Sequence, residues 1–149
     1  MSRGILSPFQ IDYLFVTDSR FHIEESPSER MEAGVEVSMD SMELSREGEQ
    51  SCLESRVSVS ANLHDADNPD KALMTAAVVL RIGVHGNIGT GMGDGEARRV
   101  LAANAVSLAY SHARSIVNSA AAESPARSFL IPGIDPWAVV DEVMSQSEQ

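Results

Sequence analysis

The side chains of this sequence that most often take part in catalysis or metal binding are its four histidines and its single cysteine. They are His22, His64, His85, His112 and Cys52. The histidines form neither the H-E-x-x-H zinc motif nor another ligand spacing. Cys52 has no partner for an intramolecular disulfide, and the sequence has no G-x-S-x-G nucleophile elbow. We therefore expect no catalytic residues, no metal site and no enzyme, and an enzyme that uses His112 or His22 stays the alternative.

Two short segments look like ligand loops but lack the defining residues. In the acidic cluster at residues 65–70, Asp70 and Ala76 stand where an EF-hand calcium loop needs Gly and Glu. We interpret this cluster as a polar hairpin turn. The glycine-rich run at residues 86–95 contains neither G-x-G-x-x-G nor a phosphate-binding G-x-x-x-x-G-K-[ST] motif. It predicts a connection between a strand and a helix, and no cofactor is expected.

Acidic residues are concentrated in the first half of the chain. The sequence has 22 Asp and Glu against 11 Lys and Arg, a formal net charge of -11, and residues 24–54 hold ten acids against Arg30 and Arg46. This balance excludes a general affinity for the phosphates of nucleic acids. Two interpretations of the acidic segment stay open. It is either a solvated surface that keeps the protein soluble, or a docking surface for a basic partner or for cationic unfolded segments.

The 149 residues suffice for one domain with its own core. We place this domain at residues 1–144 and expect a frayed polar tail at residues 145–149. No stretch approaches the ~18 apolar residues of a membrane span, and no secretory signal is evident. The lone cysteine fits a reducing compartment. We therefore expect a cytoplasmic protein with no membrane insertion.

Alternation of apolar and polar residues predicts four β-strands, at residues 9–23, 35–44, 53–63 and 74–85. In the first strand one parity is apolar, and its members are Phe9, Ile11, Tyr13, Phe15, Phe21 and Ile23. The second strand changes parity near Asp40, as a β-bulge would produce. The fourth strand is apolar on both parities, which is typical of a strand buried on both faces or partly buried in an interface. We predict that the four strands form an antiparallel meander.

A long helix is predicted at residues 94–122, with Asp94 as its N-cap, and a short one starts at residues 135–136. The apolar stripe of the long helix comprises Ala97, Leu101, Ala105, Leu108, His112, Ile116 and Ala120. Alanine fills much of the remaining surface, so this helix is thin and permits close approach from more than one side. The sequence thus predicts an α+β fold. A four-stranded antiparallel sheet carries a long helix packed on one face, followed by a short C-terminal helix.

The order of these elements, together with several short motifs, resembles the SecB family of protein-export chaperones. Residues 9–21, which contain Thr17-Asp18, resemble the first SecB strand, and residues 108–117 resemble the family's Y-A-R-x-x-I helix. The clearest similarity is at residues 129–139, where alternating apolar residues and proline precede a Trp, as in the family's terminal loop. The resemblance covers most of the chain, and it implies a SecB-like fold.

SecB proteins are tetramers, built as dimers of dimers, that hold unfolded precursor proteins without ATP and pass them to the SecA motor. The resemblance implies an apolar client-binding groove whose residues here are Phe129, Ile131, Ile134, Trp137, Met39, Met42 and Leu44. Core packing is the alternative for each of them. It also implies an acidic face for partner docking, at Asp18 and Glu24. Contacts between copies of the thin helix are expected at Ala105, Ala109, His112 and Ile116.

Two departures from the family bear on the partner. His22 stands where the family has a second acid, and Arg81 is the only charge between residues 73 and 82 of the fourth strand. SecA docking is therefore one alternative, and a solitary SecB-like chaperone for an antitoxin of a toxin–antitoxin system is another. The leading hypothesis is an ATP-independent holdase of SecB type that keeps unfolded precursor proteins export-competent. A ligand-binding or structural oligomer on the same fold is the hypothesis from another class.

Overall fold

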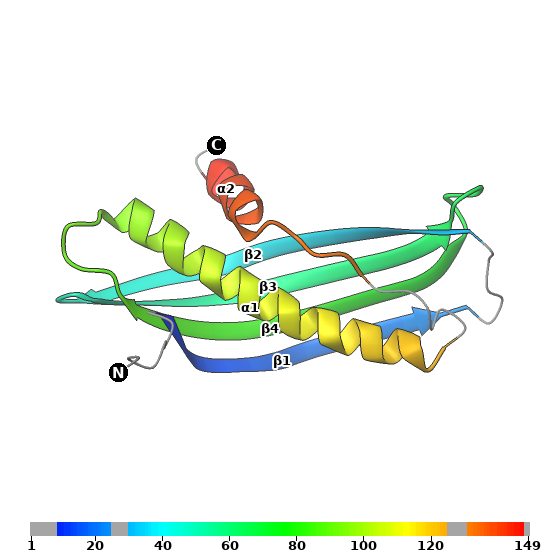
Figure 1. Cartoon of the computed structure of the whole chain (residues 1–149), viewed down its shortest axis with the longest axis horizontal. Coiled ribbons are helices and arrows are strands. Elements are labelled where there is room, and N and C mark those ends of the chain that lie inside the picture. Colours follow the sequence, from blue (N-terminus) through cyan, green and yellow to red (C-terminus); the bar gives the residue numbers. More distant parts are fainter. Residues whose placement is uncertain (1–8, 25–29, 125–130, 148–149) are drawn as a thin grey trace, which may run out of the picture.

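A computed structural model describes residues 9–24, 30–124 and 131–147, which form one four-stranded sheet and two helices (Figure 1). The elements are β1 (Phe9–Ile23), β2 (Met31–Glu47), β3 (Gln50–Asp65), β4 (Ala72–Asn87), α1 (Asp94–Ala122) and α2 (Pro136–Ser147). The predicted α+β class, with a long helix packed on an antiparallel sheet and a short terminal helix, is confirmed. The second helix continues through Ser147, into the tail that the sequence predicts as frayed. Neither helix of the described residues is long and apolar enough to cross a membrane.

The strand order differs from the predicted meander. Neighbouring strands follow the order β1-β4-β3-β2, so only β2, β3 and β4 form a meander and β1 crosses to the far edge. All three pairings are antiparallel, with Val16 and Val57 both opposite Leu80 of β4. Side-chain alternation defines the two faces of a strand but does not select its neighbour. In β4 the residues that face the helices, such as Leu80 and Ile82, are fully buried, whereas Val79 and Arg81 on the other face are only half-buried.

The core lies between α1 and one face of the sheet. Alternate residues of β3 and β4 are fully buried there, and the largest are Leu53, Val57, Leu63, Met74, Leu80 and Ile82. Burying one such side chain contributes about 1.5–3 kcal/mol relative to exposing it. Alanines of α1 face these residues, so the helix approaches the sheet closely and the large side chains fill the space from the strand side.

The buried stripe of α1 differs from the prediction in its second half. It runs through Ala109, Ala113, Val117 and Ala121, each at most 1% exposed, one residue beyond the predicted positions. His112 consequently points to solvent. The small residues face inward because they allow the closest contact between the helix and the sheet.

The first strand also departs from its predicted parity. Two register shifts, one on each side of Leu14, move Tyr13 and Phe15 to the sheet face away from the helices, which we call the open face. The ring of Tyr13 covers Gly83, where an added Cβ would lie 2.5 Å from the ring. Tyr13 and Phe15 contact each other with ring centroids 5.7 Å apart.

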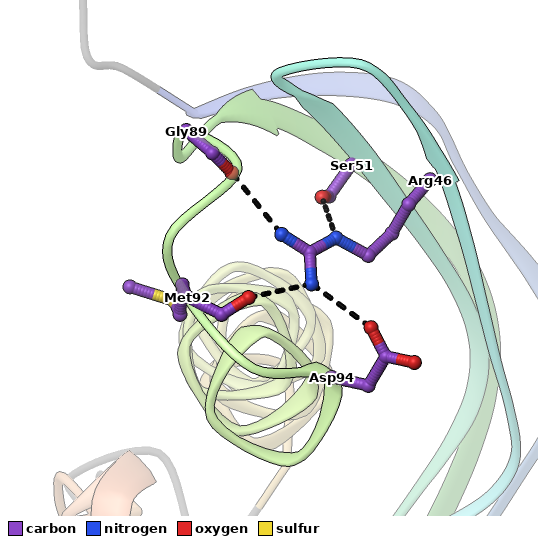
Figure 2. Close-up of polar contacts among 5 residues, drawn as sticks. All are labelled: Arg46, Ser51, Gly89, Met92 and Asp94. Atoms are coloured by element: carbon purple, nitrogen blue, oxygen red, sulfur yellow. Dashed lines mark hydrogen bonds and ion pairs between the residues drawn. The ribbon is translucent and has the colours of Figure 1, made fainter.

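One arginine joins the hairpin between β2 and β3 to the start of α1, as Figure 2 shows. Arg46 donates from Nε to Ser51 Oγ (3.1 Å) and from Nη2 to the Gly89 carbonyl (3.1 Å). Its Nη1 donates to the Met92 carbonyl (2.7 Å) and to Asp94 Oδ1 (2.9 Å). The side chain is only 19% exposed. We call this set of contacts the Arg46 clamp.

The start of α1 is therefore fixed from outside the helix. Its N-cap is Gly93, not the predicted Asp94, and no side chain caps it. Asp94 occupies the first turn and binds Arg46 instead (Figure 2). The glycine-rich connection thus positions the helix that covers the core.

Candidate functional site

A cavity of about 480 Å³ lies between β2, α1 and α2. Its lining is mostly apolar and unusually rich in methionine, and consists of Met39, Met42, Met144, Val143, Asp40, Ser41 and Arg98. We call it the methionine cavity. Two predicted groove residues, Met39 and Met42, meet here. Methionine is flexible and polarisable, so such a lining adapts to side chains of different shapes.

The predicted β-bulge in β2 is confirmed, and it builds this cavity. The register shifts after Asp40, and Ser41 adopts a φ of 54°. In a regular strand residues three positions apart lie on opposite faces, so the extra residue places Met39 and Met42 on the same side. On the open face, Arg56 Nε donates to the Asp40 carboxylate (2.8 Å), which holds the pKa of Asp40 below its usual value.

A second cavity, of about 420 Å³, continues along β2. Its lining is mixed, with the apolar residues Val35, Val37, Ile134, Val139 and Val143 and the polar residues Glu36, Ser38, Ser58, Ser60, Glu142 and Gln146. Val143 lines both cavities, so they are neighbours. The predicted groove residue Ile134 belongs to this second cavity. Leu44 is half-buried against the core and lines neither cavity.

The other predicted groove residues lie elsewhere. Ile131 is fully buried in the core, so the isolated chain does not expose it to a client. Trp137 is 41% exposed and stacks under Arg99, whose guanidinium lies 4.6 Å from the ring centroid. It lines a shallow hollow of about 180 Å³ against α1, which shares no residue with the methionine cavity. Phe129 lies outside the described residues.

The two acids predicted for partner docking are exposed but engaged. Asp18 pairs with Arg20 (3.1 Å), and Glu24 contacts His22 Nε2 (2.8 Å). Each pair joins residues two positions apart, which share one face of β1 or its extension. A basic partner would have to displace these contacts, and the docking role of both acids stays a prediction.

The residues predicted for contacts between copies divide into two groups. Ala105 and Ala109 are fully buried against the sheet, so their surface is used inside the chain. His112 is exposed and Ile116 is half-buried. The outward side of α1 instead carries exposed serines at four-residue intervals, namely Ser107, Ser111, Ser115 and Ser119.

The histidines and the cysteine do not assemble into a reaction centre within the described residues. Three histidines each contact one carboxylate, in the pairs His22 with Glu24, His64 with Glu32 and His85 with Asp12. Burial, together with nearby acids, raises the pKa of the Cys52 thiol, which therefore stays protonated. The described chain contains no group of three or more His, Cys, Asp or Glu that could hold a metal ion.

Two sets of residues at the candidate site are not predicted from the sequence. Arg98, Val143 and Met144 line the methionine cavity from the two helices, but nothing in their spacing points to β2. The second set is Tyr110, Arg114 and Asn118 of α1, which bind the chain just before α2. Their spacing of four residues, next to the alanine-rich buried stripe, is a signal in the sequence that could have identified them.

Comparison with known proteins gives a structural match only. Neither a protein family nor a curated protein matches the sequence. Among solved structures, the fold is similar to a Mycobacterium tuberculosis SecB-like chaperone, solved in complex with a ChAD peptide from the HigA1 antitoxin. The TM-score is 0.60 at 11% sequence identity, and the match covers 85% of this chain and 90% of that one. The chain therefore has a SecB-like fold.

Proposed function

We propose that this protein is an ATP-independent holdase that binds extended apolar segments of unfolded polypeptides. The methionine cavity carries this proposal, because it offers an adaptable apolar site of about 480 Å³ between a sheet edge and a short helix. The second cavity beside it lengthens the site along β2. The SecB-like fold supports the proposal, since a solved protein of this fold holds a peptide.

Two kinds of client fit this proposal about equally. One is an unfolded precursor kept competent for export, and the other is an aggregation-prone antitoxin of a toxin–antitoxin system. A peptide from an antitoxin occupies the similar solved structure, which makes an antitoxin a client worth testing beside a precursor. Purifying the protein from its native cells and identifying the bound chains distinguishes the two, and co-purification of SecA would assign the export role.

We further propose that the protein acts as a homotetramer, with strand edges paired within dimers and the outward sides of α1 packed between them. The outer strand β1 supports this, since Ile11, Phe15, Val16 and Phe21 are 36–51% exposed. The serines of α1 allow close helix contact. Light scattering at micromolar concentration tests the assembly, and a compact monomer would refute it.

The holdase activity is tested by diluting a chemically unfolded protein into buffer with an equimolar amount of the chain and no ATP. Light scattering should show suppressed aggregation. Met42→Ser should weaken this suppression about fivefold or more, because it removes apolar surface from the methionine cavity. Met92→Ser is the matched control, since Met92 is also half-buried but lines neither cavity.

The outcomes separate the classes of function. Equal loss in both methionine variants would show that the cavity is not the binding site. A folded parent chain that never suppresses aggregation would instead be a structural or ligand-binding oligomer. Dependence on a cofactor, or turnover of a substrate, would contradict the non-enzymatic role.

A further inference from the structure

The residues just before α2 cross the surface of α1 and are bound there through their backbone. Asn118 Oδ1 accepts from the N–H of Ile131 (3.0 Å), and Arg114 Nε donates to the carbonyl of Ile131 (2.8 Å). The hydroxyl of Tyr110 donates to the carbonyl of Pro132. The three side chains are four residues apart, so they form one row along the helix. We call this row the polar ladder, and the bound residues 131–132 the strap, which Figure 1 shows as the start of the orange segment between α1 and α2.

The ladder contacts only backbone atoms of the strap, and one side chain is buried beside it. Ile131 is 0% exposed, whereas Pro132 and its neighbour Gly133 are exposed. In peptide recognition, hydrogen bonds to the main chain give affinity and a side-chain pocket gives specificity. The ladder and the buried position of the Ile131 side chain therefore have the two parts of a peptide-binding site, and the chain's own residues fill it.

The ladder also has donors suited to a second peptide. Burial raises the pKa of Tyr110, so its hydroxyl stays protonated and donates. For Arg114, no hydrogen bond or ion pair within the described residues engages Nη1 or Nη2. A guanidinium carries five N–H donors, and only the one on Nε is used by the strap. An extended segment longer than the strap would find further donors for its carbonyls.

The strap is able to leave without unfolding α2. The helix begins with its own turn, in which Asp135 Oδ1 accepts from the N–H of Trp137 (3.0 Å). It is fixed to α1 by the ion pair between Arg99 and Asp141 (2.6 Å), and to the core by the fully buried Val140. None of these contacts involves the strap.

We propose that the polar ladder is a binding site for client segments, and that the strap occupies it as an intramolecular competitor until a client displaces it. This inference rests on the proposed holdase function. The client is an extended segment with a branched aliphatic residue whose N–H and carbonyl are free. The next residue needs only a carbonyl, so proline is accepted. A tethered competitor acts at a high effective concentration, and only segments that match the ladder well replace it.

Hydrogen exchange on the full-length protein tests the displacement directly. At saturating concentrations of a carboxymethylated, permanently unfolded protein, the Ile131 amide should exchange at least about tenfold faster, because it loses Asn118 as acceptor. Amides in the centre of β3 provide the internal control and should not change. An unchanged or slower rate at Ile131, with the client bound, would overturn the proposal.

A synthetic peptide with the sequence of residues 127–136 tests the ladder independently of any unfolded protein. It should bind to the parent chain, and methylation of the amide nitrogen of its Ile should weaken binding about fivefold, the effect of one hydrogen bond. Ile131→Val in the protein should tighten peptide binding about fourfold, equivalent to about 0.8 kcal/mol, since the competitor loses one buried methylene. Unchanged or weaker binding would show that Ile131 does not compete. If the chain binds the peptide in this way but captures no unfolded protein, the holdase function is refuted, whereas the polar ladder is still supported as a peptide-binding site.

Discussion

The Arg46 clamp allows a quantitative prediction about what holds α1 on the sheet. Arg46→Ala removes hydrogen bonds to Ser51 Oγ and to the carbonyls of Gly89 and Met92, and an ion pair with Asp94. Each hydrogen bond from a charged donor is worth about 1.5–3 kcal/mol when its acceptor stays buried. The ion pair adds little, because the Asp94 side chain is 76% exposed.

The expected loss is smaller than the sum of these contacts. Both carbonyls belong to the connection between β4 and α1, where water can reach them once the guanidinium is gone. We therefore expect the free energy of unfolding to fall by roughly 2–4 kcal/mol. For a chain of 149 residues this lowers the thermal midpoint by roughly 5–15 °C. Arg46→Lys should lie between the parent and the alanine variant, because an ammonium reaches fewer of these acceptors.

Urea unfolding followed by circular dichroism measures the effect, and hydrogen exchange locates it. Amides of residues 88–98 should exchange faster in Arg46→Ala, while those of β3 follow only the global change. Arg20→Ala is the control, because Arg20 is 79% exposed and makes one surface pair. If both variants lie within about 0.5 kcal/mol of the parent, the clamp does not hold the helix and the reasoning is refuted.

The other predictions concern packing, charge and the site. Ala109→Leu should cost about 1–3 kcal/mol in urea unfolding, because Ala109 is fully buried against the sheet, whereas the exposed His112→Leu should change stability little. Gly83→Ala should push the Tyr13 ring off the open face and cost about 1 kcal/mol, seen as a changed near-UV spectrum and a lower thermal midpoint. The depressed pKa of Asp40 means that its stabilisation is present above about pH 4 and is lost as the pH falls through the folded value. Asp40→Asn should therefore lose less stability than the parent between about pH 5 and about pH 3, measured by urea midpoints. Trp137 lines a hollow apart from the methionine cavity, and its client-binding role stays a prediction. On that prediction, Trp137→Ser should weaken capture of unfolded protein in the aggregation assay while leaving the thermal midpoint nearly unchanged, because Trp137 is 41% exposed.

Each of these has a result that contradicts it. If His112→Leu destabilises the protein as much as Ala109→Leu does, then His112 also faces the sheet and the buried side of α1 is not the one described. An unchanged near-UV spectrum in Gly83→Ala would mean that the ring does not rest on the glycine. If Asp40→Asn and the parent lose stability equally as the pH falls, the ion pair between Asp40 and Arg56 does not stabilise the bulge. Unfolding of Trp137→Ser would assign Trp137 to the core.

The sequence predicts the elements well, because periodicity and helix ends are local signals. The bulge after Asp40 is visible as a change of parity, and the structure confirms it. The meander is wrong because pairing between β1 and β4 is a long-range choice that alternation does not encode. The stripe of α1 shifts to Ala109 and Ala113 because closeness to the sheet, rather than side-chain size, selects the inward side.

The candidate site is predicted only in part, for a similar reason. Met39 and Met42 share a strand, so their proximity follows from the bulge. Their proximity to α2 depends on the path of the chain between α1 and α2. The sequence does not determine how close to β2 that path places α2. Ile134 and Trp137 are three residues apart yet line different hollows, since successive positions of a turn into a helix point in different directions.

Because β1 lies at the far edge of the sheet beside β4, it is synthesised before the other three strands but pairs after them. Strands β2, β3 and β4 pair with their sequence neighbours, whereas Thr17 of β1 contacts Val79, which is 62 residues away. Local pairings close quickly, and pairings across long loops come late. The strand that leaves the ribosome first must therefore wait for β4 before it finds its partner. During that interval its apolar residues are exposed, so this chain passes through the state of an unpaired apolar strand each time it is made. Transferring the β1 segment to a position directly after β4, ahead of α1, would make every strand pairing local and shorten that interval.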